Sequence, residues 1–312
     1  MTTLDPVITA QVDAFRTCEF STVAADGTPV GWPVSMQRRP DGTLLITSPL
    51  GFPQKALNVR RNGRVSLLFS DPTGSGLDAD RQILITGTAT CAEEIAAGPE
   101  GLESYWSMLF RRQPGSRRYL DPPARWLMDW YYLRLLIVVT PQQICTRSRI
   151  PTPLPRDDAA PAHGTPHRPV PLGSGLLAEF GTVVLVALDS AGAPVGLRTR
   201  AVPGETDYTL TIPGDAVVEP GPASLLLHSH DELLARLRCA LIRGELAQDA
   251  EGWRFTPHRL VRPAASSTPG QQLQTLQQAR ARANRYLERR GLSRPRVRWD
   301  LYRAVAAASP DR

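Results

Sequence analysis

The chain carries two copies of one strand pattern, and this internal repeat constrains its fold more than any other feature. Residues 20–31 form a β-rich run, an Asp-Gly turn and a second β-rich run, a strong local signal for a hairpin. The same order of segments begins again near residue 179. Five echoes pair residues 19–23 with 179–183, 29–31 with 194–196, 65–68 with 223–226, 81–87 with 238–244, and 140–141 with 256–257. Five echoes in one order indicate a duplication, so we predict two tandem, mainly β domains.

A segment rich in Pro, Gly, Ser and Asp separates the two copies at residues 147–174. This composition is typical of a semi-extended linker. We therefore predict a first domain at residues 1–146 and a second, shorter domain at 175–264. The second copy is shorter because it lacks a counterpart of residues 93–131, which we expect to be mostly helical.

The remaining segment, residues 265–312, begins with a helix signal. Thr268 is a good N-cap, a proline stands at the first helical position, and Gly291 supplies a stop, which predicts a helix over residues 268–290. Its leucines lie near one stripe and its arginines elsewhere, as in a helix that docks on a domain. A nucleic-acid-binding arm is the alternative.

Composition excludes several classes of protein. Hydrophobic residues make up 42% and charged residues 21%, and no apolar run is long enough to span a membrane. The first residues lack the pattern of a signal peptide, so we expect a cytoplasmic protein. Cys18, Cys91, Cys145 and Cys239 are far apart and form no C-x-x-C pair, which argues against a metal site or a disulfide framework. The net charge of +6 is dispersed, which argues against nucleic-acid binding.

Lys55 is the only lysine among 36 basic residues. Such a ratio indicates a coding bias that replaces lysine by arginine wherever either residue serves. A compact ammonium and a planar guanidinium are not interchangeable where a point charge must fit a confined site. We therefore predict that Lys55 has a functional role.

Lys55 follows a loop that has the composition of an anion site. Thr47 and Ser48 place two hydroxyl groups at the end of a predicted strand, a Gly/Pro loop follows, and Gln54 and Lys55 open a short helix. The N–H groups of a helix N-terminus and a lysine together suit a phosphate. By this pattern alone the loop could equally be a solvated turn.

The residues around this loop resemble a known family. The loop is followed by Asn-x-Arg-Arg-Asn-x-Arg-Val-Ser-Leu-Leu at residues 58–68, an acidic turn, and Arg-Gln-Ile-Leu-Ile-Thr-Gly at 81–87. Over residues 10–146 this order is similar to that of the pyridoxamine 5′-phosphate oxidase-like split β-barrel superfamily, including its flavin/deazaflavin oxidoreductase branch. The fold class that follows is mostly β with added helices (α+β): two tandem split β-barrels, the second degenerate, and a C-terminal helix.

The resemblance implies a cofactor, FMN or a deazaflavin coenzyme, and residues that bind it. Lys55 corresponds to the basic residue that holds the cofactor phosphate, and Gln82 to the glutamine that reaches the isoalloxazine ring. The implied set is Val34, Ser35, Met36 and Gln37 along the ring, Thr47, Ser48, Gln54 and Lys55 at the phosphate, and Gln82. Gln54 stands where the oxidase has a second base, and the oxidase's C-terminal substrate motif is missing. Pyridoxamine phosphate is therefore not the expected substrate.

The second copy has lost the phosphate loop. Residues 211–222 contain no lysine or arginine, and Asp215 and Glu219 would repel a phosphate. Because members of the family form homodimers with the cofactor at the interface, we expect the second copy to replace the partner subunit within one chain. A homodimer of the whole chain remains possible on the sequence.

His228 and His230 share one face of a predicted strand, which is the minimal geometry for a metal or haem ligand. No third ligand is evident, so we interpret them as ordinary half-buried histidines and Trp126, Trp130 and the tyrosines that follow as core. Two functions stay open. One is a flavin- or deazaflavin-dependent oxidoreductase that transfers a hydride to or from a small organic substrate. The other is a non-catalytic FMN- or haem-binding protein.

Overall fold

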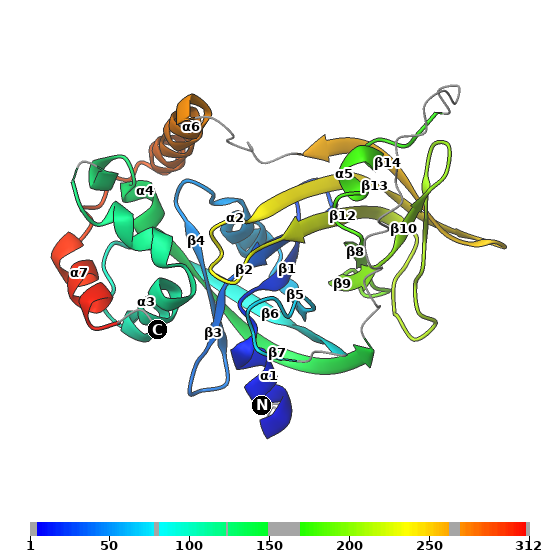
Figure 1. Cartoon of the computed structure of the whole chain (residues 1–312), viewed down its shortest axis with the longest axis horizontal. Coiled ribbons are helices and arrows are strands. Elements are labelled where there is room, and N and C mark those ends of the chain that lie inside the picture. The colour runs from blue at the N-terminus through cyan, green and yellow to red at the C-terminus, as the bar shows by residue number, and fades with distance from the viewer. Residues whose placement is uncertain (1–4, 78–80, 123, 149–168, 262–268, 310–312) are drawn as a thin grey trace.

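Two antiparallel sheets of seven strands each form the bulk of the molecule, with most helices gathered at one end (Figure 1). The computed structural model describes residues 5–77, 81–122, 124–148, 169–261 and 269–309. The predicted class, mostly β with added helices, is confirmed. None of the helices in these ranges is long and apolar enough to cross a membrane. Most of the predicted linker lies outside the described residues, so the domain boundaries stay a prediction.

The first sheet has the order β2-β1-β5-β6-β7-β4-β3. Its strands are β1 (Cys18–Val23), β2 (Pro29–Val34), β3 (Met36–Arg38), β4 (Leu44–Pro49), β5 (Arg64–Phe69), β6 (Arg81–Ala96) and β7 (Arg134–Ser148). The turn between β1 and β2 is the predicted Asp-Gly turn, in which Gly27 has a φ of 83° that suits glycine. Long neighbouring strands β6 and β7 form the spine of this sheet (Figure 1).

The second sheet repeats this topology strand by strand. Its strands are β8 (Val183–Leu188), β9 (Pro194–Thr199), β10 (Ala201–Pro203), β11 (Tyr208–Leu210), β12 (Gly221–Ser229), β13 (Arg238–Asp249) and β14 (Gly252–Val261). Taken from the opposite edge, the order is β9-β8-β12-β13-β14-β11-β10, which matches the first sheet when strands are counted within each copy. The sequence repeat is therefore also a repeat of topology.

Both copies have a β-bulge at the same point. In each copy a glycine of one strand lies beside a Thr-Pro pair of the neighbouring strand, and both motifs belong to the sequence repeat. The register shifts at Gly87 between β6 and β7, and at Gly244 between β13 and β14. A Cβ atom at Gly87 would lie 2.2 Å from the carbonyl oxygen of Thr140, and one at Gly244 would lie 2.3 Å from that of Thr256. Only glycine permits this approach of two backbones, so both copies keep it.

The helices pack mainly against the first sheet. They are α1 (Pro6–Ala14), α2 (Gln54–Arg61), α3 (Glu103–Arg112), α4 (Asp129–Tyr132), α5 (Ser174–Leu177), α6 (Pro269–Glu288) and α7 (Trp299–Ala307), with 3₁₀ turns η1 (Pro114–Tyr119) and η2 (Ala124–Trp126). The helical insertion starts later than predicted, because β6 continues to Ala96 and pairs there with β7. The second copy lacks this insertion, as predicted, because a short turn joins β13 to β14.

Helix α6 docks on the first sheet, as predicted, but Leu273 of the predicted stripe is 46% exposed. Ala279, Ala283, Tyr286 and Leu287 are buried in the same core as the residues of β4 and α2. The aromatic run before β7 is also mostly core, since Trp130 and two following tyrosines pack in ring contacts. Trp126 is the exception, because 59% of it is exposed. Helix α7, which the sequence did not predict, covers the same aromatic cluster through Trp299 and Tyr302.

The two sheets pack on each other through equivalent residues. Each sheet contributes one glycine against two residues of the other: Gly31 against Val186 and Leu226, and Gly196 against Ser21 and Leu68. Ser21 and Val186 occupy equivalent positions in β1 and β8, because each pairs with the glycine of its own sheet. Each copy therefore uses equivalent residues to contact the other copy. An interface of this kind is typical of two subunits in a symmetric dimer.

Gly31→Val tests this packing. An added Cβ would already lie 3.0 Å from Cγ2 of Val186, and the branch of valine would force the sheets apart. We expect the free energy of unfolding in urea to fall by about 1–3 kcal/mol, the usual cost of overpacking a core. Gly115→Ala is the control, because a Cβ there meets nothing within 4 Å. Unchanged stability of Gly31→Val would show that the sheets are not tightly packed at this point.

One buried charge cluster also joins the sheets. Oε1 of Glu19 on β1 accepts hydrogen bonds from Nη2 of Arg198 on β9 (2.8 Å) and Oγ of Ser70 (2.7 Å), and lies 2.7 Å from Nε2 of His228. Burial alone would raise the pKa of Glu19, but the hydrogen bond with His228 and the charge of Arg198 lower it below its ordinary value. The cluster therefore stabilises the interface with Glu19 ionised.

Glu19→Gln should destabilise the protein and change its response to acid. At pH 7 the loss should be about 3 kcal/mol, because Arg198 stays buried without its carboxylate. A carboxyl whose folded pKa is lowered adds stability above its unfolded pKa, near 4.5, and loses it as the pH falls through the folded value. The variant should therefore lose less stability than the wild type between pH 5 and 3 in urea titrations. Asp13→Asn, in an exposed pair with Arg38, is the control and should change little.

Candidate functional site

Lys55 is the second residue of α2, directly after the loop that leaves β4. The loop is held by a hydrogen bond from Oγ of Ser48 to the carbonyl oxygen of Phe52 (2.7 Å). No side chain caps the N-terminus of α2. The first N–H groups of a helix need acceptors and carry partial positive charge, so this end of α2 favours an anion.

Lys55 lines a cavity of about 210 Å³, which we call the inner cavity. Polar groups from the first sheet and its helices reach this cavity: Ser35, Thr47, Lys55, Tyr105, Gln113 and Arg134. Oγ1 of Thr47 donates a hydrogen bond to Oη of Tyr105 (3.0 Å). No aspartate or glutamate is among the described residues that line the inner cavity.

Arg134, the first residue of β7, is the second cation of the inner cavity. Only 4% of it is exposed, and its guanidinium lies 4.2 Å from the ring centroid of Tyr131 and 4.9 Å from that of Trp106. Its Nε and Nη2 atoms are buried and have no hydrogen-bond partner among the described residues. A buried guanidinium normally has a carboxylate or another acceptor, so these two donors call for an anionic ligand.

The lowered pKa of Lys55 is consistent with the lack of acidic residues around the inner cavity. Burial, and then repulsion by Arg134, lower this pKa from 10.5 to about 8. Within the described ranges, Lys55 has no hydrogen-bond or ion-pair partner. An anion between Lys55 and Arg134 would relieve the repulsion and favour the charged amine.

The second sheet closes the inner cavity. Leu234 and Leu237, in the connection between β12 and β13, line it together with Thr47 and Lys55 of the first copy. Leu234 has a φ of 52°, and it is the only described residue other than glycine with a positive φ. Such a backbone costs of the order of 1 kcal/mol and is found where the surrounding structure holds a functional loop in place.

The structure brings some of the predicted site residues together and separates others. Val34, Ser35, Thr47 and Lys55 line the inner cavity, whereas Gln54 lines a neighbouring pocket on the other side of Lys55. Met36 and Gln37 face a separate depression beside α3. Ser48 is fully buried and acts within its loop.

Gln82 lies in the interface between the sheets, away from both cavities. Its Oε1 accepts from the backbone N–H of Arg198 (3.3 Å), and its Nε2 donates to the carbonyl oxygen of Ser148 (3.3 Å). Because both ends of its amide are engaged, a contact of Gln82 with a cofactor ring stays a prediction from the resemblance.

Sequence reasoning missed Arg134, Tyr105 and the two leucines of the second sheet. One signal was present for Arg134: a lone arginine between apolar residues at the start of a buried strand is unusual. Nothing in the pattern of residues 231–237 indicates that they reach the first sheet.

His228 and His230 are buried rather than half-buried, which corrects the expectation. Their rings stack with centroids 6.4 Å apart, and Nε2 of His230 lies 3.0 Å from Oγ1 of Thr17. Nε2 of His228 contacts Glu19, so neither histidine offers a free Nε2 to a haem iron. Over the described residues there is no group of three or more His, Cys, Asp or Glu that could hold a metal ion.

The equivalent position in the second sheet has no such site. Residues 211–220, between β11 and β12, contain no helix where α2 stands in the first copy. Asp215 in this segment forms an ion pair with Arg147 (2.9 Å) on β7. The segment therefore presents carboxylates and no cation, in agreement with the loss read from the sequence.

A family model confirms the resemblance for the first half of the chain. The model described as pyridoxamine 5′-phosphate oxidase matches residues 4–127, which is less than half of the chain. This segment carries β1 to β6, α2 and most residues of the inner cavity. Over these residues the first copy is similar to the pyridoxamine 5′-phosphate oxidase family, in agreement with the resemblance seen in the sequence.

Solved structures resemble the chain over about half of its length. A conserved hypothetical protein from Mycobacterium tuberculosis is 23% identical, with a TM-score of 0.34, over 47% of this chain and 86% of its own. An F420 reductase is 23% identical, with a TM-score of 0.32, over 46% and 98%. General stress protein 26 from Bacillus anthracis is 21% identical, with a TM-score of 0.30, over 45% and 89%. No curated protein matches the chain.

The pKa of Lys55 can be measured directly, because the chain has one lysine. Reductive methylation with ¹³C-formaldehyde labels only Lys55 and the N-terminal amine, and Lys55→Arg assigns the signals. We expect the Lys55 resonance to titrate near pH 8 and its midpoint to rise when inorganic phosphate is added. A midpoint near 10.5 without phosphate would mean that the amine is fully solvated, and no shift with phosphate would exclude an anion at this site.

Proposed function

We propose that the chain is an oxidoreductase whose first barrel binds one phosphorylated flavin or deazaflavin cofactor, FMN or an F420-type coenzyme, in the inner cavity. The cofactor transfers a hydride to or from a small organic substrate. The similarity of the first copy to the pyridoxamine 5′-phosphate oxidase family supports the cofactor class. We do not expect pyridoxamine phosphate as the substrate, because the oxidase's C-terminal substrate motif is missing from the sequence.

The observation that carries this proposal is a buried cation, Arg134, and a half-buried cation, Lys55, that face one cavity without a carboxylate among its described lining residues. Arg134 has two donors without acceptors, and Lys55 has a lowered pKa. Two like charges in a low-dielectric site are costly unless an anion joins them. A phosphate group satisfies both, since guanidinium and ammonium groups are the usual partners of phosphate oxygens.

Each residue of the cavity has a role in this arrangement. Lys55, Arg134 and the N-terminus of α2 hold the phosphate, and the hydroxyl of Thr47 can add a hydrogen bond. The segment of Val34 and Ser35 forms the wall along which the ring would lie. Leu234, which is buried, and Leu237, which is 48% exposed, add apolar surface from the second copy. The cavity is smaller than the roughly 300–1,000 Å³ usual for small-molecule sites, so the strained loop that carries Leu234 must move when a whole cofactor enters.

The second sheet supplies what a partner subunit would supply. It packs reciprocally on the first sheet and places apolar residues over the inner cavity. We infer that one chain therefore holds one cofactor site, because the equivalent site in the second copy lacks its cation and its helix.

The protein's own contribution to catalysis is then binding, orientation and exclusion of water. The bound cofactor supplies the hydride chemistry. Tyr105 lines the inner cavity, and burial raises its pKa, so it stays protonated at neutral pH and can donate a hydrogen bond there.

Substitution of the two cations should separate binding from stability. We expect Lys55→Gln and Arg134→Met each to weaken FMN or F420 binding at least tenfold, since a charged hydrogen bond contributes about 1.5–3 kcal/mol. Arg134→Met should also raise the stability of the ligand-free protein by about 1 kcal/mol, because it removes a buried guanidinium whose Nε and Nη2 atoms have no hydrogen-bond partner among the described residues. Flavin fluorescence or absorbance titration and urea unfolding measure the two effects.

Arg118→Gln is the matched control, because Arg118 is exposed on η1 and lies outside the cavity. It should change neither binding nor stability. Equal cofactor affinity in wild type and both variants would overturn the site. Absorbance of the purified protein between 300 and 500 nm separates a flavin or deazaflavin from a haem, and reduction of the bound cofactor by a substrate separates an enzyme from a carrier.

A further inference from the structure

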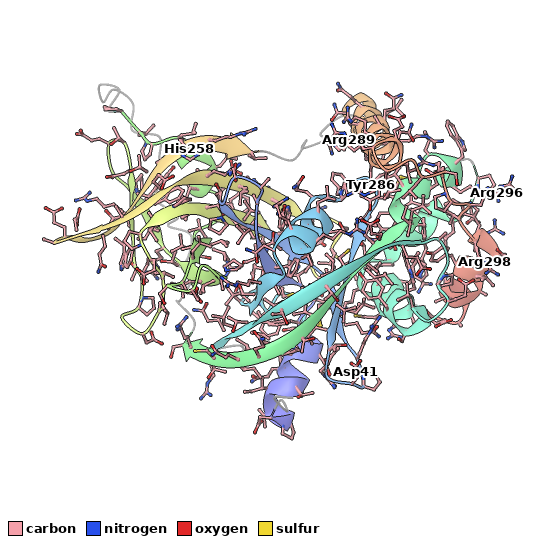
Figure 2. All side chains as sticks on the ribbon, turned by 180° about the vertical axis from the view of Figure 1, so that it is seen from behind. Asp41, His258, Tyr286, Arg289, Arg296 and Arg298 are labelled. Atoms are coloured by element: carbon pink, nitrogen blue, oxygen red, sulfur yellow. The ribbon has the colours of Figure 1, made fainter. Side chains whose placement is uncertain are left out.

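A second, larger pocket lies on the other side of Lys55. It has a volume of about 490 Å³ and is lined by α2, the loop before it, Trp32 of β2, and the C-terminal end of α6. We call it the outer pocket. Figure 2 shows Tyr286 and Arg289 at this end of α6, above the first sheet. The family model ends at residue 127, so α6 and its wall of the pocket are additions outside the matched segment.

The outer pocket is strongly cationic. Its charged lining residues are Lys55, Arg282, Arg285, Arg289 and Arg290, and no carboxylate is among the described lining residues. Other arginines of the same region are neutralised, because Asp129 pairs with Arg280 (3.4 Å) and Arg294 (2.6 Å). Arg280 and Arg294 thus pair with Asp129 of α4. The arginines that line the pocket have no ion pair with a carboxylate among the described residues.

The geometry of this second group favours phosphate over a simple counterion. The buried stripe of α6 fixes the helix, so Arg282, Arg285 and Arg289 follow one another along the rim of the pocket at spacings of three and four residues. Nε of Arg290 is buried and has no partner among the described residues. Guanidinium groups bind phosphate oxygens in pairs of parallel hydrogen bonds, so several of them around one pocket can hold more than one phosphate.

Aromatic and apolar residues form the other wall. Phe52 is 41% exposed, and the guanidinium carbon of Arg282 lies 5.3 Å from the centroid of the Phe52 ring. Trp32 is half-buried, and Leu57 completes the surface. An exposed phenylalanine and an indole beside a row of arginines provide a stacking surface for a flat ring that carries an anionic tail.

We propose that the outer pocket binds a nucleotide that carries a diphosphate, with the phosphates among the arginines of α6 and the base against Trp32 and Phe52. This site goes beyond the cofactor site and shares only Lys55 with it. The diphosphate can belong to a free nucleoside diphosphate or to the dinucleotide form of the flavin, which would extend past Lys55 from one cavity to the other.

The test uses the full chain and ADP as the probe, with binding followed by calorimetry and by tryptophan fluorescence. We expect ADP to bind at least tenfold more tightly than AMP, and Arg285→Gln/Arg289→Gln to weaken ADP at least tenfold and reduce the slope of log Kd against log salt. Both arginines are exposed, so the variant should fold normally. Arg296→Gln, which removes an exposed charge outside the pocket, is the control.

Two competition experiments distinguish a free nucleoside diphosphate from the dinucleotide form of the flavin. If FMN-saturated protein still binds ADP, the pocket takes a free nucleotide; if FAD displaces ADP and binds more tightly than FMN, one dinucleotide spans both cavities. FMN affinity should be within twofold of wild type in the α6 variant, so loss of the inner site and loss of the outer site are separable. Absence of ADP binding at millimolar concentration, equal binding by the double variant, or equal binding of a triglutamate peptide would each overturn the proposal.

Discussion

The packing of one sheet on the other is the constraint on which the rest of the structure depends. Each sheet has its own apolar core, and Leu68 and Leu84 of the first sheet are in addition buried in the core of the second. Reciprocal contacts at Gly31 and Gly196 set the distance between the sheets, and the buried Glu19–Arg198 pair sets their registration. The same packing carries Leu234 over the inner cavity, so the fold and the proposed site share one interface.

The charge distribution shows how two copies of one domain diverged. In the first copy, Lys55 and Arg134 stand near each other without a carboxylate, at a cost to the ligand-free protein. In the second copy, the corresponding loop carries Asp215, which is used in an ion pair with β7. Two neighbouring cations that destabilise the ligand-free protein are expected at a binding site. The ion pair of Asp215 with Arg147, by contrast, has a structural role, because it joins two segments.

Helix α6 lies outside the segment that the family model matches, yet it contributes to the core of the first copy. Its apolar stripe docks on the core of the first sheet, which fixes the helix, and the residues at the edge of that stripe are then held over α2. A hydrogen bond from Nη1 of Arg60 on α2 to Oη of Tyr286 (2.8 Å) joins the two helices beside the outer pocket, which Tyr286 lines. A helix read from sequence as a docking element thereby becomes one wall of a cationic pocket.

The sequence by itself determined the repeat, the mainly β class, the docking helix and the place of Lys55 at the start of a helix, because these depend on local spacing, turn residues and residue choice. Only the tertiary structure decided which residues stand beside Lys55. Arg134 lies 79 positions away and Leu234 belongs to the other copy. Gln82 was expected at the cofactor and lies in the interface, because the strand motif fixes its position in β6 but the second sheet decides what covers that face. Contacts between distant segments arise from how the sheets pack, and no local pattern encodes them.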